Sequence, residues 1–228
     1  MLCFFTIFLS LWMAAPQAQA QYETPEQLLE RVKDSLVEVR TTDSKTFNEA
    51  NGQTVVGTYH TQGYGVIIDS NGLIVTNTHI ITNAPHIFVG LSDGTIMEAK
   101  KVYSSDADFS FIKIEPSSPL TPITFADSSQ VQAGANIIAL TNGADDQRHI
   151  LGGQITNMIN GVDSNNVELL ELNLDLIEGD SGGPILDDQG QLLGLIMAKR
   201  NDQDNKSYAI ASNKIQQEYQ QYQQSLPL

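Results

Sequence analysis

Hydrophobic and polar residues along the chain alternate over short runs, which is the pattern of β-strands separated by turns. In the first half the expected strands are Val37–Thr41, Val66–Ile68, Leu73–Val75, His86–Leu91, Thr95–Val102 and Phe109–Ile114. In the second half they are Asn136–Thr141, His149–Ile159, Val167–Leu174, Pro184–Leu186, Leu192–Ala198 and Tyr208–Ala211. Residues 42–62 are polar and contain glycine, and predict a long surface loop. Many short strands of this kind favour sandwich or barrel lobes.

A helix is expected at each end of the strand-rich region. The first begins at Thr24, with Pro25 at the first helical position and Gln27 three residues after the cap, as in a capping box. Apolar residues then recur at helical spacing, namely Leu28, Val32 and Leu36. Ser212 is expected to cap the last helix, which would bury Ile215, Tyr219 and Tyr222.

The segment Pro116–Pro122 breaks the β pattern and is interpreted as the connection between two lobes. We therefore divide the chain into residues 1–20, a first lobe at 21–118 and a second lobe at 119–228, with both lobes in one domain.

Composition changes this picture mainly through charge. The 228 residues include 12 basic and 27 acidic side chains, a net charge of −15. This charge argues against nucleic acid and anionic lipid as partners, because both are bound through clusters of Lys and Arg.

Residues 1–20 are typical of an export signal. Leu2–Ala15 is almost wholly apolar, and Ala18-Gln19-Ala20 fits a small-x-small cleavage site. Cleavage after Ala20 would place the protein in a periplasm or outside the cell, with no stable membrane insertion. It would also remove Cys3, the single cysteine of the chain, so we expect no intrachain disulfide.

The candidate chemistry centres on Gly179-Asp180-Ser181-Gly182-Gly183-Pro184. Glycines allow a turn whose amides converge on one point, and a serine beside such a nest can attack a carbonyl. The alternative interpretation is a tight polar turn between strands.

A base and an acid for this serine stand upstream. His79 ends the apolar run that begins at Ile74, and Asp108 immediately precedes the apolar strand at Phe109. A buried carboxylate needs a partner, and an imidazole N–H would provide one. The alternatives are a structural histidine and an aspartate that closes a turn. The order His79, Asp108, Ser181 is that of chymotrypsin-type folds.

Five segments carry a resemblance to a known family: Gly63–Ile67, Val75–His79, Asp108–Lys113, Gly179–Pro184 and Ser207–Ile210. The chain resembles a trypsin-like serine protease, and is most similar to the protease domain of the HtrA/Deg type, from about Leu28 to the final helix. The resemblance implies an all-β fold of two six-stranded antiparallel barrels with the site between them. It also implies His79 as general base, Asp108 as its orienting acid and Ser181 as nucleophile.

By the same resemblance, the amides of Gly179 and Ser181 form an oxyanion hole, and neither a cofactor nor a metal is expected. Three features depart from the family. No PDZ domain is expected after the last helix, and Asp180 replaces the usual Asn. Tyr64 replaces a small residue, and its larger side chain would either narrow the approach to the site or simply pack. No activation sequence that would supply a partner for Asp180 is apparent.

The primary specificity pocket is assigned to Asp175, Met197, Ala198 and Lys199. Asp175 lies six residues before Ser181, where a trypsin-like enzyme carries the acid that selects Arg or Lys. It also fits a shortened form of the HtrA-type segment, whose pocket takes small apolar side chains. We favour the second interpretation and expect cleavage after small or medium apolar residues.

The function expected from these features is that of an exported serine endopeptidase acting on proteins or peptides. The alternative is a binding or scaffold protein that has the protease fold but no catalysis. An esterase is disfavoured, because no Gly-x-Ser-x-Gly elbow on a strand-to-helix turn is present. A homo-oligomer is left open.

Overall fold

The computed structural model describes residues 23–42, 59–142, 148–160, 167–177, 179–199 and 206–227. The predicted export signal and its cleavage site lie outside these residues, as does Glu178 beside the nucleophile loop.

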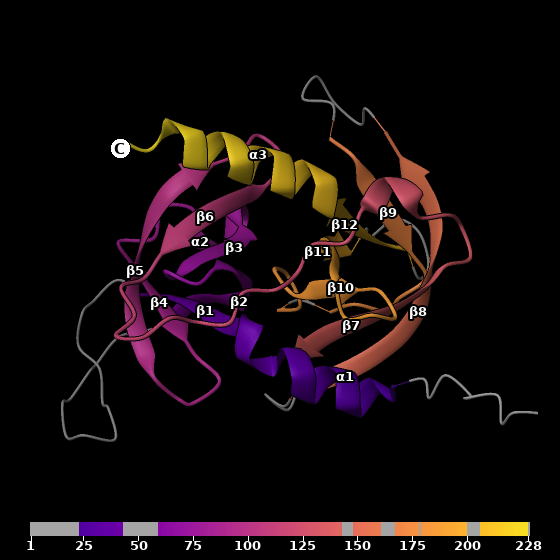
Figure 1. Ribbon diagram of the computed structural model, residues 1–228, viewed down its shortest axis with the longest axis horizontal. Helices are drawn as coiled ribbons and strands as arrows, with labels where there is room; N and C mark the ends of the chain where they lie inside the picture. The colour runs from indigo at the N-terminus through magenta and orange to yellow at the C-terminus, as the bar shows by residue number, and fades with distance from the viewer. Residues whose placement is uncertain are drawn as a thin grey trace, which may run out of the picture.

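The strands close into two antiparallel barrels of six strands each, ordered β1-β2-β3-β6-β5-β4 and β10-β11-β12-β9-β8-β7 (Figure 1). The first contains β1 (Leu36–Thr42), β2 (Tyr59–Asp69), β3 (Leu73–Asn77), β4 (His86–Gly90), β5 (Ile96–Ser104) and β6 (Phe109–Lys113). The second contains β7 (Asn136–Asn142), β8 (Arg148–Ile159), β9 (Leu169–Leu172), β10 (Pro184–Leu186), β11 (Leu192–Lys199) and β12 (Ser207–Ala211). This confirms the expected fold class.

Each barrel has its own apolar core, and a third apolar cluster joins the two barrels to the terminal helices. Fully buried examples are Ile74 and Ile112 in the first barrel, Leu172 and Ile185 in the second, and Phe109 and Leu195 in the joining cluster. Burial of apolar surface is the main stabilising term in folding. The contact between the barrels is therefore part of the protein's core.

The predicted loop at 42–62 is wrong at both ends, because β1 includes Thr42 and β2 already begins at Tyr59, while residues 43–58 lie outside the described residues. Thr61 and Gln62 pair with Thr41 and Arg40 of β1. Backbone pairing extends this strand beyond its apolar part, which the hydrophobic pattern alone does not reveal.

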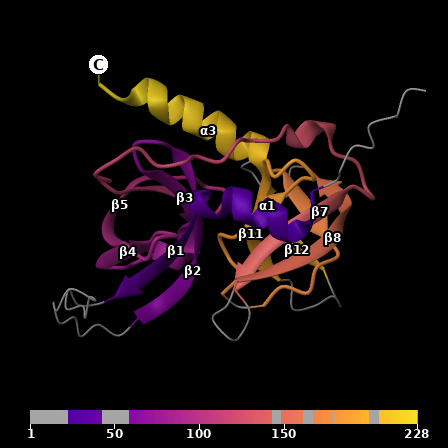
Figure 2. The same ribbon diagram turned by 60° about the horizontal axis from the view of Figure 1, so that its bottom comes forward.

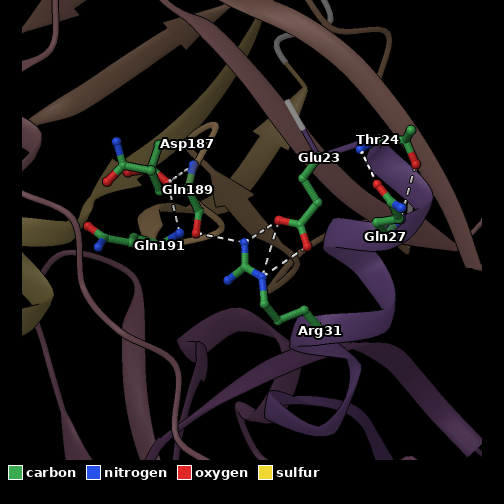
Figure 3. Close-up of polar contacts among 7 residues, drawn as sticks. All are labelled: Glu23, Thr24, Gln27, Arg31, Asp187, Gln189 and Gln191. Carbon is green, nitrogen blue, oxygen red and sulfur yellow. Dashed lines mark hydrogen bonds and ion pairs between the residues drawn. The ribbon is translucent and has the colours of Figure 1, made fainter. Parts of the chain in front are cut away.

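The first helix, α1 (Pro25–Val32), has the predicted capping box between Thr24 and Gln27. A 3₁₀ turn, η1 (Lys33–Ser35), follows, so Leu36 begins β1 and is not part of the helix. Although α1 precedes the first barrel in sequence, it lies against the second (Figure 2). Arg31 pairs with Glu23 at 2.7 Å and donates to the carbonyl of Gln189 at 2.9 Å (Figure 3).

The last helix, α3 (Ser212–Ser225), begins at Ser212, but Ser212 does not cap it. The buried Ser212 hydroxyl instead donates to the carbonyl of Ala126 at 2.8 Å. The hydroxyl of Ser128, in the 3₁₀ turn η2 (Ser128–Gln130), accepts from the Asn213 amide at 3.1 Å. The predicted cap was therefore wrong, because a residue distant in sequence satisfies the helix end.

The other end of α3 crosses to the first barrel (Figure 1). Tyr219 and Tyr222 pack against Phe111, and the Tyr219 hydroxyl donates to Asp69 at 2.9 Å. Tyr103 stacks on Phe111 and donates to Glu218. Within the described ranges, no helix has the length and apolar character needed to cross a bilayer.

Candidate active site

His79 lies in a single helical turn, α2 (Thr78–Ile81), that directly follows β3. Ile80 and Ile81 of this turn are buried in the core of the first barrel. Their burial fixes the turn and leaves the His79 side chain 45% exposed. The imidazole is thus held on a rigid element while remaining accessible.

Asp108 lies in the turn before β6 and contacts His79 twice. Its Oδ2 is 2.7 Å from His79 Nδ1, and its Oδ1 accepts from the His79 backbone amide at 3.1 Å. A carboxylate at Nδ1 favours the tautomer that carries its proton there, so Nε2 is left as a proton acceptor. The structure therefore brings two of the three sequence-predicted triad residues into direct contact.

The backbone of Asp108 is left-handed, with φ of 57°. Such a conformation is rare for residues other than glycine and costs roughly 1–2 kcal/mol, although Asp tolerates it better than most. The Asp108 carbonyl accepts from the Thr78 amide and from the Asn77 side-chain Nδ2, each at 3.1 Å. The segment before His79 therefore holds the turn that carries Asp108.

Ser181 precedes β10 in the second barrel, and its backbone is bound to the first. The Tyr64 amide of β2 donates to the Ser181 carbonyl at 2.9 Å. The Tyr64 carbonyl in turn accepts from the buried Thr76 hydroxyl at 2.6 Å. This contact fixes the nucleophile loop against the barrel that carries His79.

The glycines of the serine motif allow this close approach. A Cβ on Gly182 would lie 2.0 Å from the Tyr64 carbonyl oxygen, and the residue has φ of 81°. In the facing strand β2, a Cβ on Gly63 would lie 2.9 Å from the Ser181 carbonyl oxygen. Glycine is needed at Gly182 both for its conformation and for its proximity to β2.

The Ser181 hydroxyl donates to the carbonyl of Met197 in β11, at 3.2 Å. Among the described residues it forms no hydrogen bond with His79. The structure thus brings Ser181 to the same barrel interface as His79 and Asp108 without joining its hydroxyl to the imidazole. In enzymes without bound substrate, catalytic hydrogen bonds are often long or poorly aligned.

The loop around Ser181 is organised by Asp180, which is 2% exposed. Its Oδ2 accepts from the Ile177 amide at 2.7 Å, which identifies a partner that sequence reasoning did not find. The Asp180 and Gly183 amides donate to the carbonyls of Ile177 and Asp180. The amides predicted to form the oxyanion hole are those of Gly179 and Ser181. Within the described segments, neither of these two amides donates to a backbone carbonyl.

The residues predicted to form the specificity pocket lie on two segments. Asp175 is exposed between the buried residues Leu174 and Leu176, in a segment without regular secondary structure before the serine loop. In β11, Ala198 pairs with Tyr208 and Lys199 with Ser207, and the ladder is irregular between Ile196 and Ala198. The hydroxyl of Ser207 donates to the Leu174 carbonyl at 2.6 Å, so the two segments are linked.

Tyr64 is only 7% exposed. Of the two interpretations of this residue, packing is therefore the correct one. Sequence reasoning missed the supporting roles of Tyr64, Thr76 and Asn77. One signal was available, because Thr76 and Asn77 are polar residues that end an otherwise apolar strand.

Comparison with known proteins places the chain among proteases. The profile of the trypsin-like peptidase domain matches residues 63–195, a range that includes His79, Asp108 and Ser181. Mouse serine protease HTRA4 is 30% identical over 166 residues, which cover 70% of this chain and 34% of that protein. The putative serine protease HhoA of Synechocystis is 31% identical over 157 residues, covering 65% and 40%. The periplasmic serine endoprotease DegP of Escherichia coli K12 is 32% identical over 160 residues, covering 67% and 34%. The matched segments thus span well under half of these relatives.

Proposed function

The chain belongs to the trypsin-like peptidase family, and on that premise we propose that it is a serine endopeptidase acting on proteins or peptides. The observation that supports this most strongly is the 2.7 Å contact between His79 Nδ1 and Asp108 Oδ2. It occurs beside a serine loop that is bound to the same barrel through Tyr64.

In the proposed reaction, Ser181 Oγ attacks the scissile carbonyl carbon while His79 Nε2 takes the hydroxyl proton. The amides of Gly179 and Ser181 stabilise the oxyanion. His79 then returns the proton to the leaving amine, and the C–N bond breaks to give an acyl-enzyme. A water molecule, deprotonated by His79, releases the acid and regenerates Ser181. Asp108 keeps the imidazole oriented and stabilises its charged form.

The reaction requires Ser181 to leave the Met197 carbonyl, 3.2 Å away, and to turn toward His79. A hydroxyl can do this by rotating about a single side-chain torsion. The bond to Met197 is also the observation that favours the second candidate, a binding or scaffold protein without catalysis.

For specificity, we propose cleavage after small or medium apolar residues. The exposed Asp175 would serve a trypsin-like preference only if a basic side chain reached it. Its neighbours Leu174 and Leu176 are buried in the core of the second barrel, and the exposed apolar residue beside it is Ile177, which supports the apolar preference. Turnover of matched peptides with Val, Ala, Arg or Lys before the scissile bond measures this. A preference for Arg or Lys that disappears in Asp175→Ser would contradict it.

We also propose that residues 1–20 direct export and are removed after Ala20. One relative, DegP of E. coli, is a periplasmic enzyme by name. Sequencing the N-terminus of the exported protein should give Gln21 as the first residue, and a soluble form that retains Met1 would refute the proposal.

Labelling with a fluorophosphonate tests the main proposal, because this reagent phosphonylates activated serines. The wild type should be labelled at Ser181, Ser181→Ala should be unlabelled, and the exposed-serine control Ser117→Ala should behave like the wild type. A folded wild-type protein that neither reacts nor cleaves unfolded casein would favour the scaffold alternative.

A further inference from the structure

Asn77 is the last residue of β3 and has an unusual environment for an asparagine. It is fully buried, with 0% of its surface exposed. It also occupies the position before α2 at which asparagine normally caps a helix, yet its side chain makes no capping hydrogen bond. The ordinary explanation for an asparagine at this place therefore does not apply.

The Asn77 side-chain amide instead binds the backbone of the turn that carries Asp108. Its Nδ2 donates to the Asp108 carbonyl at 3.1 Å. Its Oδ1 is buried and has no hydrogen-bond partner among the described residues. The opposite orientation of the amide would set two acceptor oxygens against each other. The buried Oδ1 is thus left without a hydrogen bond, which costs folding free energy. In return, Nδ2 keeps its hydrogen bond to the Asp108 carbonyl.

The carbonyl that Asn77 binds belongs to the residue with the left-handed backbone. Asp108 has φ of 57°, and relaxation to an ordinary extended or helical conformation would rotate its carboxylate. The Thr78 amide is the second donor to this carbonyl. Strained backbone persists where the surroundings over-determine it, and such strain is concentrated at functional sites.

We propose that Asn77 is a positioning residue for Asp108: its side-chain amide holds the left-handed turn, so that the carboxylate faces both His79 Nδ1 and the His79 amide. The catalytic part of this inference rests on the proposed function, whereas the positioning part concerns only the geometry of Asp108 and His79. Asn77 acts through Asp108 and touches no reacting atom.

The test uses Asn77→Leu, because leucine is close to asparagine in shape. This substitution removes the donor and the unsatisfied oxygen together, so the fold should persist. Asn77→Ala provides a second variant without the donor. The matched control is Thr41→Val, which also replaces a buried polar side chain of the first barrel by an apolar one of similar shape. The Thr41 hydroxyl faces the Thr61 carbonyl in the β1–β2 ladder.

Two readouts are compared in each variant. The first is kcat and KM on a peptide substrate, and the second is the low-field NMR resonance of the His79 Nδ1 proton, assigned by its absence in His79→Gln. We expect kcat to fall about 100-fold with KM changed less than about two-fold, since a misplacement of about 1 Å has an effect of that size. We also expect the Nδ1 resonance to shift upfield or to broaden in both Asn77 variants and to be unchanged in Thr41→Val.

The resonance separates this inference from the proposed function. A wild type that does not cleave peptides, but whose Nδ1 resonance changes on Asn77→Leu, would refute the function and support the positioning role. Asn77 variants that keep the wild-type resonance would overturn the inference, whether or not activity falls, because the loss would then arise elsewhere. If Asn77→Leu does not fold, Asn77→Ala is judged by the same two readouts.

Discussion

The two halves of the candidate site are held in different ways. His79 and Asp108 both belong to the first barrel and are joined through side chain and backbone at 2.7 and 3.1 Å. Ser181 comes from the second barrel, and its backbone is tied to the first by a hydrogen bond from the Tyr64 amide to its carbonyl. Its hydroxyl faces Met197 of its own barrel.

This difference indicates which contacts the geometry of each half depends on. The orientation of the base depends on local contacts between the end of β3 and the turn before β6. The position of the nucleophile depends on the packing between the two barrels, through the close approach of Gly182 to β2. Changes within the first barrel should therefore disable the base without moving the serine, whereas changes at the barrel contact should displace the serine.

The largest expected effect is on turnover in Asp108→Asn. An amide at this place cannot stabilise the charged imidazole and favours the wrong tautomer, which should lower kcat by about 10⁴-fold. The fold should persist because the shape is unchanged. Peptide hydrolysis measures the loss, and the exposed acid Asp106, changed to Asn, is the control for charge.

If Asp108→Asn retained wild-type turnover, or if Asp106→Asn were equally impaired, the base–acid pair would not have the role assigned to it.

The barrel contact is broken most directly by Gly182→Ala. The new Cβ would lie 2.0 Å from the Tyr64 carbonyl oxygen in a backbone with φ of 81°. Strain and overpacking together should lower the free energy of unfolding by about 2–5 kcal/mol. Urea unfolding of the variant measures this.

Gly179→Ala is the matched control for stability, since Gly179 has φ of 102° but no atom within 4 Å of its added Cβ. It should lose only the conformational part, about 1–2 kcal/mol. Equal losses for the two variants would show that the contact with β2 is unimportant.

The smallest expected effect is on the pH dependence of stability, and it arises where the far end of α3 packs on the first barrel, away from the site. Burial, aided by the hydrogen bonds to Glu218 and Asp69, raises the pKa of Tyr103 and of Tyr219 from 10.0 to about 12. Because the folded state holds these protons more tightly, their contribution to stability is complete below pH 10 and is lost as pH rises toward 12.

Thermal unfolding between pH 9 and 12 should therefore show a steeper loss of stability in the wild type than in the Tyr103→Phe/Tyr219→Phe double variant. Parallel curves would refute this.

The fold was largely predictable because strand alternation and turn residues are local signals. The features missed depend on partners distant in sequence. Ser212 was expected to cap α3, but Ser128 satisfies that helix end. The polar start of β2 is strand because it pairs with β1.

The sequence predicted the residues of the candidate site, but not the contacts that hold them in place. Motif order identified His79, Asp108 and Ser181 as candidates. No local pattern shows that Asp108 is left-handed, that Asn77 binds its carbonyl or that Asp180 accepts from the Ile177 amide. The direction of the Ser181 hydroxyl likewise depends on β11, which follows it in the chain.

The central claim is that the serine of the second barrel works with the base–acid pair of the first. A crystal structure of the protein after reaction with a fluorophosphonate tests it most directly. We expect the phosphonyl group on Ser181 Oγ, its oxygen about 2.7–3.1 Å from the Gly179 and Ser181 amides, and His79 Nε2 within hydrogen-bond distance of Ser181 Oγ. An adduct on another residue, or an unmodified Ser181 still bonded to Met197, would contradict the account.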